Sequence, residues 1–416
     1  MTMYQAFDDV HILAGCRTPM VDYMGAFADA NPIDLGIFAA RALLARAGVD
    51  AARVDSVISG NMAPGGFDQF YVARHIGLYA GVPQQVPALN VQRICGTGFE
   101  VFRQAGEQIG AGCASLALVV GTESMTRNPI AAFDHRGGFR LGAPIGFKDY
   151  MWEALSDPAA VSMIQTAENL AQKYGISRAE VDAFAALSFA RAVAAQEAGW
   201  FEGEVVPVSN STFELPGYKP RPLKLSGKVA VADRDTHPRP TPPEVLAKLR
   251  TVFKDGVQTG GNSSALTDAA AAALVGSGAV ARDWAAASGQ QPLARLAAAA
   301  VVGVAPEFMG IGPAPAIQLL LQRSGLKLAD IARFEINEAQ GAQTLAVARE
   351  LQLDTERLNV KGGAIALGHP LAATGVRLTV TVARQLKDIN ARWGVASACV
   401  GGGQGIALLV ENTAAA

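Results

Sequence analysis

Two cysteines and one histidine have the chemical types and surroundings of a nucleophilic active site. Cys95 follows an apolar run and precedes Gly96-Thr97-Gly98, beyond which the pattern is helical. A thiol at the start of a helix lies near the positive end of the helix dipole, so we expect its pKa to be lowered and the thiolate enriched. His369 stands between a glycine and a proline, which predicts a turn. Histidine is the side chain best suited to activate a thiol near neutral pH.

A second thiol, Cys399, ends an apolar strand and is followed by Gly401-Gly402-Gly403, which predict a turn before the next strand at 406–410. Backbone N–H groups exposed in such a turn can form an oxyanion hole. Asn337 follows the predicted strand 331–336, at the end of a strand where α/β folds bind ligands. Taken singly, these residues also fit a packed thiol, a turn histidine, a tight hairpin and a helix N-cap. It is their combination that predicts chemistry.

Composition bounds the possible functions. The chain has 416 residues, half of them hydrophobic, which suits two or three units with large buried cores. A net charge of -2 gives no electrostatic case for binding nucleic acid or a membrane surface. Four scattered cysteines without a CxxC pair argue against a disulfide framework and a zinc site. We therefore expect a cytoplasmic protein without a metal, and the start of the chain shows no targeting pattern.

Short apolar runs alternate with helical patterns, which predicts an α/β sheet covered by helices on both faces. The first such elements are a strand at 10–15, a helix at 35–47 ended by Gly48, and a strand at 54–59. The runs at 89–91 and 358–360 both read Leu-Asn-Val. Each leads into a helical pattern, an apolar strand and glycines, so one architectural unit is used twice.

The middle of the chain has a different rhythm. Glycine, proline and charged residues gather at 127–149 and 209–243. Between them a helical stretch is interrupted near Gly175, and Ser177 with Glu180 predicts a capping box that restarts it. The two irregular segments are longer than ordinary connections, which favours a functional or interfacial role. The stretch 127–150 is either an assembly segment or a surface loop.

One motif points to a different chemistry. Residues 276–281 follow an apolar run and fit GxGxxA, as in a dinucleotide site. Such a site needs an acidic residue about 20 positions later, and none lies between Asp283 and Glu307. We therefore interpret this segment as a turn at the end of a strand.

The motifs in their order along the chain resemble those of the thiolases, acyltransferases that make and break carbon–carbon bonds between acyl-CoA units. The resemblance covers nearly the whole chain. Besides the Cys95 segment, it is carried by Arg17-Thr18-Pro19, Gly121-Thr122-Glu123-Ser124-Met125, Thr166-Ala167-Glu168-Asn169, Tyr174-Gly175-Ile176-Ser177-Arg178, Gly261 to Asp268, Asn337-Glu338-Ala339, Gly368-His369-Pro370 and Cys399 to Gly403.

This resemblance implies a thiolase fold, a duplicated five-layer αβαβα core with an inserted loop domain. The N-terminal α/β half would span 1–121 and be completed by about 251–290. The inserted loop domain would span 122–250, and the C-terminal α/β half 291–416.

The resemblance also implies a role for each site residue. Cys95 would carry the acyl group, His369 would activate it, and Cys399 would move the α-proton of the second acyl-CoA. Asn337 would hold a water at the thioester oxygen, and the backbone N–H groups of Cys95 and Gly401 would form a second oxyanion hole. The substrates would be acyl-CoA and CoA, with no metal or nicotinamide cofactor.

Two further positions concern the coenzyme and the acyl chain. Ser264 would contact the pantetheine arm. Met163 lies in Ser162-Met163-Ile164-Gln165, where the family often has His-Met-Gly, so coenzyme contacts there are expected to differ. The family usually continues Asn-Glu-Ala with Phe, and Gln340 stands there instead, which makes the substrate pocket more polar.

The implied assembly is a homodimer or homotetramer without nucleic-acid or membrane partners. Two alternatives share the fold: a ketoacyl synthase-like condensing enzyme, and a non-catalytic acyl-CoA or lipid carrier. A second thiol in place of a second catalytic histidine disfavours the first, and the intact Cys95, His369 and Cys399 disfavour the second.

Overall fold

The computed structural model of the chain describes residues 2–133, 136–142, 144–157 and 159–415. Its core is an 11-stranded sheet made of two sets of five strands, with β3 (Val21–Asp22) added to the first. In spatial order, the first set is β5 (Ala88–Val91), β4 (Ser56–Gly60), β6 (Leu116–Ser124), β13 (Thr267–Ser277) and β2 (Val10–Arg17). The second is β15 (Ile331–Ile336), β16 (Trp393–Val400), β17 (Gln404–Glu411), β14 (Ala294–Gly303) and β1 (Met3–Ala6).

The two sets repeat one topology. In the first, β4 is parallel to β5 and β6, and β13 is antiparallel to β6. In the second, β15 is parallel to β16, and β17 is antiparallel to β16. Leu89 pairs with Ile58 of β4, and Leu358 forms a parallel bridge with Phe334 of β15. The two Leu-Asn-Val runs therefore occupy equivalent places, which confirms that the unit is duplicated.

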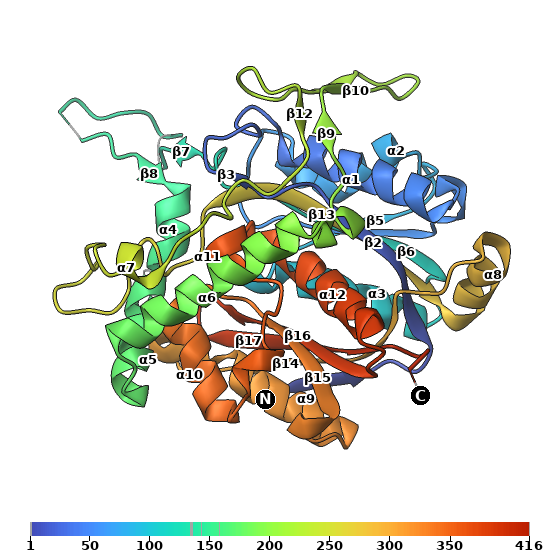
Figure 1. Cartoon of the computed structure of the whole chain (residues 1–416). Coiled ribbons are helices and arrows are strands. Elements are labelled where there is room, and N and C mark those ends of the chain that lie inside the picture. The colour runs from blue at the N-terminus through green and yellow to red at the C-terminus, as the bar shows by residue number, and fades with distance from the viewer. Residues whose placement is uncertain (1, 134–135, 143, 158, 416) are drawn as a thin grey trace.

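Helices fill three layers around these strands (Figure 1). α1 (Pro32–Ala47) and α2 (Val72–Ala80) cover the outer face of the first set, at the top of the view. α3 (Thr97–Gly110) and α12 (Leu371–Asp388) pack against each other in the middle, where α12 contacts strands of both sets. α9 (Pro313–Ser324) and α10 (Gly341–Leu351) lie at the bottom, with α9 on the second set. The five layers are those expected of a thiolase fold.

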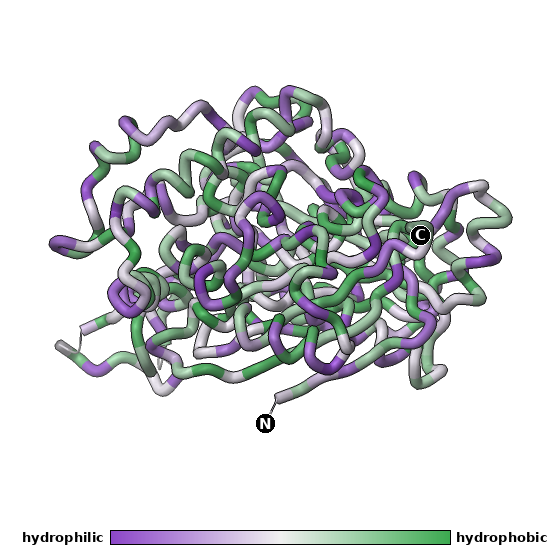
Figure 2. Tube along the Cα trace, turned by 60° about the horizontal axis from the view of Figure 1, so that its bottom comes forward, coloured by the Kyte–Doolittle hydropathy of each residue, from purple (hydrophilic) through white to green (hydrophobic). Residues whose placement is uncertain are grey.

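Alternating burial explains how an alanine-rich strand can separate two layers. In β13, Ala269, Ala271 and Ala273 belong to the core that includes α3 and α12, whereas Ala270 and Ala272 belong to the core under α1. Successive side chains of a strand point to opposite faces, so β13 contributes to both cores. Hydrophobic and hydrophilic residues follow one another in short stretches along the trace (Figure 2).

Between β6 and β13 the chain leaves the sheet. The residues described in this part form the α-helices α4 (Tyr150–Ser156), α5 (Met163–Tyr174), α6 (Arg178–Glu197) and α7 (Pro243–Leu246). Its short strands are β7 (Ile130–Ala131), β8 (Lys148–Asp149), β9 (Val208–Ser209), β10 (Ser211–Phe213), β11 (Arg221–Leu223) and β12 (Val231–Ala232). α6 begins with the predicted capping box of Ser177 and Glu180. It packs against α11 (Ala364–Leu367), directly before His369.

The interpretation of 276–281 as a turn was wrong. β13 runs to Ser277, and α8 (Gly278–Ser288) begins at the next residue with Ser277 as its N-cap. The Asp9 side chain lies against Gly278, so an acidic group of the chain itself already faces the start of this helix. Among the residues that the structure describes, no helix combines the length and apolarity needed to cross a membrane.

Candidate active site

Cys95 lies in a tight turn directly before a central helix. The turn is a 3-10 helix at Ile94–Gly96, and α3 follows at Thr97. Ile94 has a φ of 46°, a left-handed conformation that is an outlier for a β-branched residue. Such strain persists only where the surroundings enforce it. The hydroxyl of Thr97 donates to the Ile94 carbonyl at 2.7 Å and accepts from the Arg93 N–H at 2.8 Å, which closes the turn around the thiol.

The hairpin after Cys399 is fastened to this turn. Val400 pairs with Gln404, so residues 401–403 connect β16 to β17 as the sequence predicts. The guanidinium of Arg93 donates to the Gln404 side chain at 2.8 Å and to Glu100 at 3.0 Å. The backbone N–H of Gly401 is hydrogen-bonded to the Cys95 sulfur. The first thiol and the predicted oxyanion donor therefore meet, although they are far apart in the sequence.

Cys399 is fully buried on the other side of this hairpin. It packs with Met163 of α5 and with Met309, and the partly buried Ala339 joins the same cluster. Burial raises the pKa of its thiol, and the nearby charge of Cys95 raises it further. A Cβ atom on Gly401 would lie 3.2 Å from Ile94, beside Cys95, and 3.9 Å from Met163, beside Cys399, so both thiols flank the same hairpin.

His369 lies at the start of the other central helix, α12, in the place that Cys95 occupies before α3. Its ring Nδ1 is 2.6 Å from the hydroxyl of Thr374, which donates to the Pro370 carbonyl at 3.1 Å. Because the Thr374 proton is already donated, its oxygen accepts from Nδ1–H, and the lone pair remains on Nε2. Burial lowers the pKa of His369 to about 3, with a contribution from Arg377, so the ring is neutral. Leu371, two residues beyond, packs against Cys95.

Asn337 completes this group from the end of β15. Its Nδ2 lies 3.3 Å from Nε2 of His369, and its Oδ1 is buried without a hydrogen-bond partner in the described part of the chain. Its backbone N–H donates to the Ser397 carbonyl of β16 at 2.9 Å, which fixes the strand end. An unpaired buried amide oxygen beside an imidazole suits a bound water or a polar substrate atom.

The expected lowering of the Cys95 pKa was wrong. Burial raises the pKa of this thiol to about 12, and the negative charge of Glu123 adds to the effect. Hydrogen bonds from the backbone N–H groups of Gly401 and Cys95 act in the opposite direction. The cost of removing the thiolate from water outweighs the stabilisation that the N-terminus of α3 gives it. The resting residue is therefore a neutral thiol that needs a base.

Glu123 is a part of this site whose role the sequence did not disclose. Gly60 pairs with Gly121, and Ile336 pairs with Ser397, so Glu123 occupies in the first half the place of Cys399 in the second. Its carboxylate accepts from the backbone N–H groups of Met62, Ala63 and Ala372 at 3.1–3.2 Å. It thereby joins the first half to the start of α12.

Close packing of the two central helices depends on glycine. A Cβ atom on Gly98 of α3 or on Gly121 of β6 would collide with the Ala372 backbone at the start of α12. Only glycine lets these backbones approach so closely. The spacing between Cys95 and His369 is set here, where the two halves touch.

The positions expected to contact the coenzyme lie next to these groups. The backbone N–H of Ser264 donates to the Ala339 carbonyl at 3.1 Å, and the Ala265 carbonyl accepts from the His369 N–H at 3.0 Å. The side chain of Gln340 lies 2.6 Å from the Ser263 hydroxyl. Met163 is in the Cys399 cluster. All eight predicted site residues thus gather around one region of the fold.

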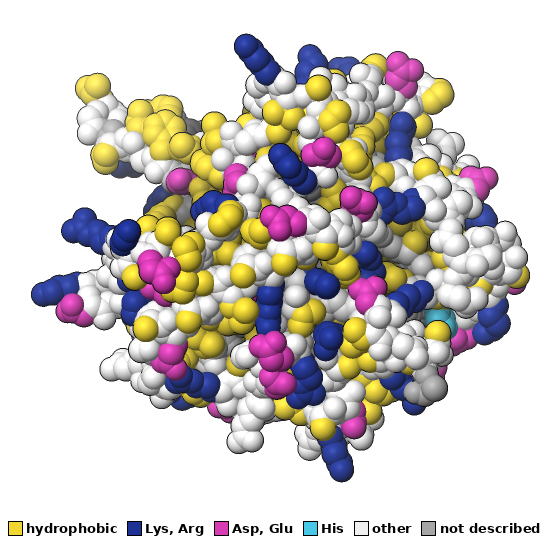
Figure 3. Space-filling view, in the orientation of Figure 1, with side chains coloured by type: hydrophobic (Ala, Val, Ile, Leu, Met, Phe, Trp, Pro, Cys, Tyr) yellow, Lys and Arg dark blue, Asp and Glu magenta, His cyan; other side chains and the backbone are white. Residues whose placement is uncertain are grey.

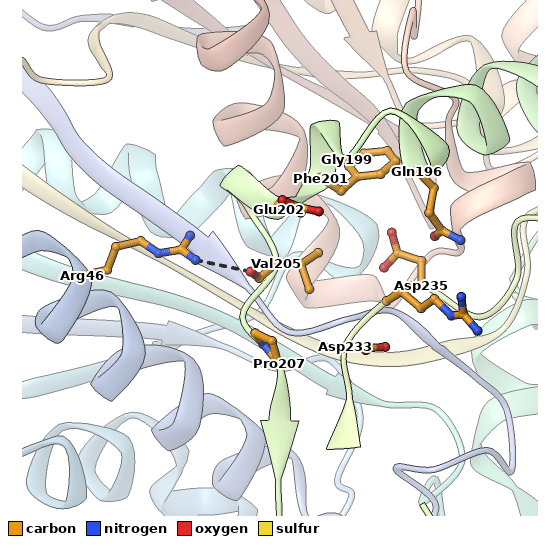
Figure 4. A pocket seen from close by; sticks show the side chains of 10 residues that line it. Arg46, Gln196, Gly199, Phe201, Glu202, Val205, Pro207, Asp233 and Asp235 are labelled. Carbon is orange, nitrogen blue, oxygen red and sulfur yellow. Dashed lines mark hydrogen bonds between the residues drawn. The ribbon is translucent and has the colours of Figure 1, made fainter. Parts of the chain in front are cut away.

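A separate cavity of about 400 Å³ contains none of the predicted residues. Arg46, Gln196, Phe201, Asp233 and Asp235 are among its lining (Figure 4). Arg46 donates to the Val205 carbonyl at 3.3 Å, and Asp235 is bound by the buried Arg17 at 2.6 Å. Arg46 and Asp235 are therefore engaged in holding the insertion to the first half. Within the part of the chain that the structure describes, no three His, Cys, Asp or Glu side chains are grouped as metal ligands.

Comparison with known proteins agrees with this geometry over almost the full chain. Residues 10–279 match the family model described as thiolase, N-terminal domain, and residues 290–412 match thiolase, C-terminal domain. The chain belongs to the thiolase family.

Relatives of this thiolase include enzymes of animals and bacteria. It is 41% identical over 408 residues to the mitochondrial 3-ketoacyl-CoA thiolase of Bos taurus, covering 97% of this chain and 98% of that one. It is also 41% identical over 410 residues to an acetyl-CoA acetyltransferase of Pseudomonas aeruginosa, covering 97% and 99%. The crystal structure of human mitochondrial 3-ketoacyl-CoA thiolase in complex with CoA matches with a TM-score of 0.89 and 40% identity, covering 97% and 98%.

Three supporting residues of this thiolase lay outside the predicted site: Thr374, Glu123 and Glu338. Thr374 sets the tautomer of His369, and its only signal was its position one helical turn beyond the predicted histidine turn. Glu338 is buried beside Asn337 and accepts from Ser188, Asn359 and the Ile365 N–H at 2.7, 2.8 and 3.2 Å. An acidic residue directly after an apolar strand is a signal that can be read from the sequence. A carboxylate buried at such a strand end must have hydrogen-bond partners, because burial without them would be too costly.

Proposed function

We propose that this thiolase transfers an acetyl or short acyl group between coenzyme A thioesters through an acyl-cysteine intermediate. The observation that carries this proposal is the meeting of Cys95, the Gly401 N–H, Cys399 and the Asn337–His369 pair in one buried site. A nucleophile, a neutral base and a second thiol are the groups that a two-step transfer requires.

The first step acylates Cys95. His369 accepts the Cys95 proton on Nε2, and the sulfur bonds to the thioester carbonyl carbon. The bond from this carbon to the CoA sulfur breaks, and Cys399 donates its proton to the departing CoA. The thiolate that remains on Cys399 is a strong base, because burial raises the pKa of this thiol.

The second step forms the carbon–carbon bond. The Cys399 thiolate removes an α-proton from a second acyl-CoA, and the resulting carbanion attacks the acyl carbon on Cys95. The Cys95 sulfur leaves and recovers its proton from His369, so all three groups return to their starting states. The reverse sequence is the thiolytic cleavage of a 3-ketoacyl-CoA.

Hydrogen-bond donors stabilise the oxygen that becomes negative in each step. The backbone N–H groups of Cys95 and Gly401 serve one oxyanion, beside the reacting sulfur. Asn337, through a water, and protonated His369 serve the other. Donors fixed in a dry site stabilise such charge far more than water does, because they need no reorganisation.

Ser264 and Met163 are proposed to contact the pantetheine arm, and Gln340 to line the substrate pocket. The reaction needs no cofactor beyond the coenzyme A thioesters themselves. The human relative with a matching fold was crystallised with CoA, and its fold match supports coenzyme A as the small-molecule partner of this chain.

We also propose a homodimer or homotetramer in the cytoplasm. The edge strand β5 exposes Leu89, and Phe67 and Phe70 are exposed nearby in the sequence. Apolar side chains at positions 130–147 also project into solvent, on the segment at the upper left of Figure 3. Exposed apolar surface of this kind marks interaction sites. The four cysteines, all unpaired, suit a reducing compartment.

The test is CoA-dependent cleavage of acetoacetyl-CoA by the purified protein, with Cys95→Ala alongside. We expect cleavage by the wild type and none by the variant. Release of carbon dioxide from malonyl-CoA without thiolysis would instead support a condensing enzyme of the ketoacyl synthase type. Binding of acyl-CoA without any turnover would support a carrier.

A further inference from the structure

Four polar side chains form a buried group directly behind the Cys399 pocket. These are Gln258, Ser263, Gln340 and Gln343, which we call the amide cluster. Gln258 is 0% exposed, Gln343 1% and Gln340 8%. Three buried carboxamides in one place are unusual, because glutamine is mostly a surface residue.

The oxygen ends of the three carboxamides are turned toward groups within the cluster. The Ser263 hydroxyl lies 2.6 Å from Oε1 of Gln340 and 3.5 Å from Oε1 of Gln258. Oε1 of Gln343 accepts from the backbone N–H of Gln340 at 3.4 Å. The Ser263 hydroxyl also lies 2.7 Å from the Thr259 carbonyl. A hydroxyl has one proton, so Ser263 cannot donate to all of these oxygens at once.

Two of the amide nitrogens have no acceptor in the part of the chain that the structure describes. Nε2 of Gln258 and Nε2 of Gln343 are buried without a hydrogen-bond partner. The Gln340 amide is already paired with the Ser263 hydroxyl. Native proteins pair nearly all of their buried donors. Two unpaired donors in one cluster therefore indicate an acceptor that comes from outside the chain.

The amide cluster adjoins the catalytic groups on two sides. Ala339, the residue before Gln340, packs in the cluster of Met163, Met309 and Cys399. The side chain of Gln343 packs against Gly310, the residue after Met309. The amide cluster therefore adjoins two residues that pack around Cys399.

We propose that the amide cluster is a subsite for an uncharged oxygen acceptor, a carbonyl or a hydroxyl, of the acyl-CoA substrate. The inference rests on the proposed thiolase function and concerns the substrate of that same site. The cluster contains no Lys or Arg, and a carboxylate desolvated without a cation would bind poorly. The oxygen belongs either to an amide of the pantetheine arm or to a substituent on the acyl chain.

The experiment compares kcat/KM for three thioesters in wild type and Gln340→Phe. The substrates are a 3-ketoacyl-CoA with a hydroxyl at the chain end, the alkyl chain of equal length, and the alkyl substrate as its N-acetylcysteamine thioester, which lacks most of the pantetheine arm. Ser263→Ala and Gln258→Leu are measured in parallel, in case the bulky phenyl ring perturbs folding. Gln318→Leu, on the exposed face of α9, is the matched control.

A hydroxyl on the acyl chain as the ligand predicts that the variants lose about tenfold in preference for the hydroxylated chain over the alkyl chain. A pantetheine amide as the ligand predicts a similar loss for both CoA substrates. The N-acetylcysteamine thioester keeps only the amide nearest the sulfur, so it shares this loss if that amide is the ligand and escapes it if the farther amide is. If the variants match the control on all three substrates while the wild type cleaves them, the subsite is overturned and the thiolase function stands. An inactive wild type would overturn both.

Discussion

The amide nitrogen of Asn337 lies 3.3 Å from Nε2 of His369. Asn337 follows the end of β15, whereas His369 lies in the turn before α12. The contact identifies Nε2 as the acceptor in the resting site, with its lone pair turned toward the Asn337 amide. It also explains why neither residue needs a charge before the substrate arrives.

Replacement of Asn337 by alanine should lower kcat for acetoacetyl-CoA cleavage by about 100- to 1000-fold, the cost of losing one oxyanion-hole donor. KM should change much less, because the interaction strengthens in the transition state. Steady-state kinetics measure both. Asn210→Ala, at an exposed site in the insertion, is the control and should retain wild-type rates. Equal effects of the two substitutions on kcat would contradict the assignment.

Thr374→Val removes the oxygen that accepts from Nδ1 of His369 at 2.6 Å, with little change in volume. The ring then loses the bond that fixes its tautomer, and we expect kcat to fall about 10- to 100-fold, as for other groups that orient a histidine. Nitrogen NMR of the labelled ring should show a mixture of tautomers. Thr379→Val lies on the same helix, where its hydroxyl bonds only the Gly375 carbonyl at 2.7 Å. This control should be kinetically silent, and a single unchanged tautomer in Thr374→Val would refute the role of Thr374.

Cys399→Ala should separate the two halves of the reaction. Acylation of Cys95 loses its proton donor to the departing CoA and should slow. No thiolate remains to take the α-proton, so condensation should stop at the acyl-enzyme. Mass spectrometry of the protein after mixing with acetyl-CoA should show acetylated Cys95 without acetoacetyl-CoA. Cys113→Ala, which removes an exposed thiol, should complete the reaction. Normal condensation by Cys399→Ala would eliminate this thiol as the base.

Glu123 should make stability depend on pH near neutrality. Burial raises its pKa from 4.5 to about 7. The folded state therefore binds more protons than the unfolded state between about pH 4.5 and 7, and the free energy of unfolding falls as pH rises through this window. A single buried group with this shift contributes at most about 3 kcal/mol.

In Glu123→Gln, the free energy of unfolding should decrease less between about pH 5 and pH 7 than in the wild type, by up to about 3 kcal/mol. Urea unfolding at these two pH values measures the difference. The exposed Glu244→Gln should leave the wild-type slope unchanged. An unaltered slope in Glu123→Gln would mean that the carboxylate titrates well below this window.

Local sequence signals located most of the core elements. The left-handed Gly48 after α1 and the capping box of α6 are signals that act within a few residues, so they were predictable. The duplicated topology was also readable, because Leu89 and Leu358 begin the same pattern. The strand-to-helix junction at Ser277 was not predictable. The glycines beside it predict a turn, but Ser277 instead caps a helix that begins directly after the strand.

The residues proposed to react could be selected from the sequence, but their electrostatics could not be predicted from it. The N-terminus of α3 favours a thiolate at Cys95, and this effect can be predicted from the sequence. The depth of burial and the carboxylate of Glu123 are consequences of how the two halves pack, and they reverse the sign. Long-range contacts such as Arg93 to Gln404 likewise leave no local signature.

The most direct measurement is the site of acyl transfer. Wild type and Cys95→Ser are mixed with acetyl-CoA, quenched in acid, digested and examined by mass spectrometry. The account predicts an acetyl group on the peptide containing Cys95 in the wild type, released by added CoA, and no acetylated thiol in the variant. Turnover of acetoacetyl-CoA by Cys95→Ser, or acetylation of the wild type at another residue alone, would contradict it.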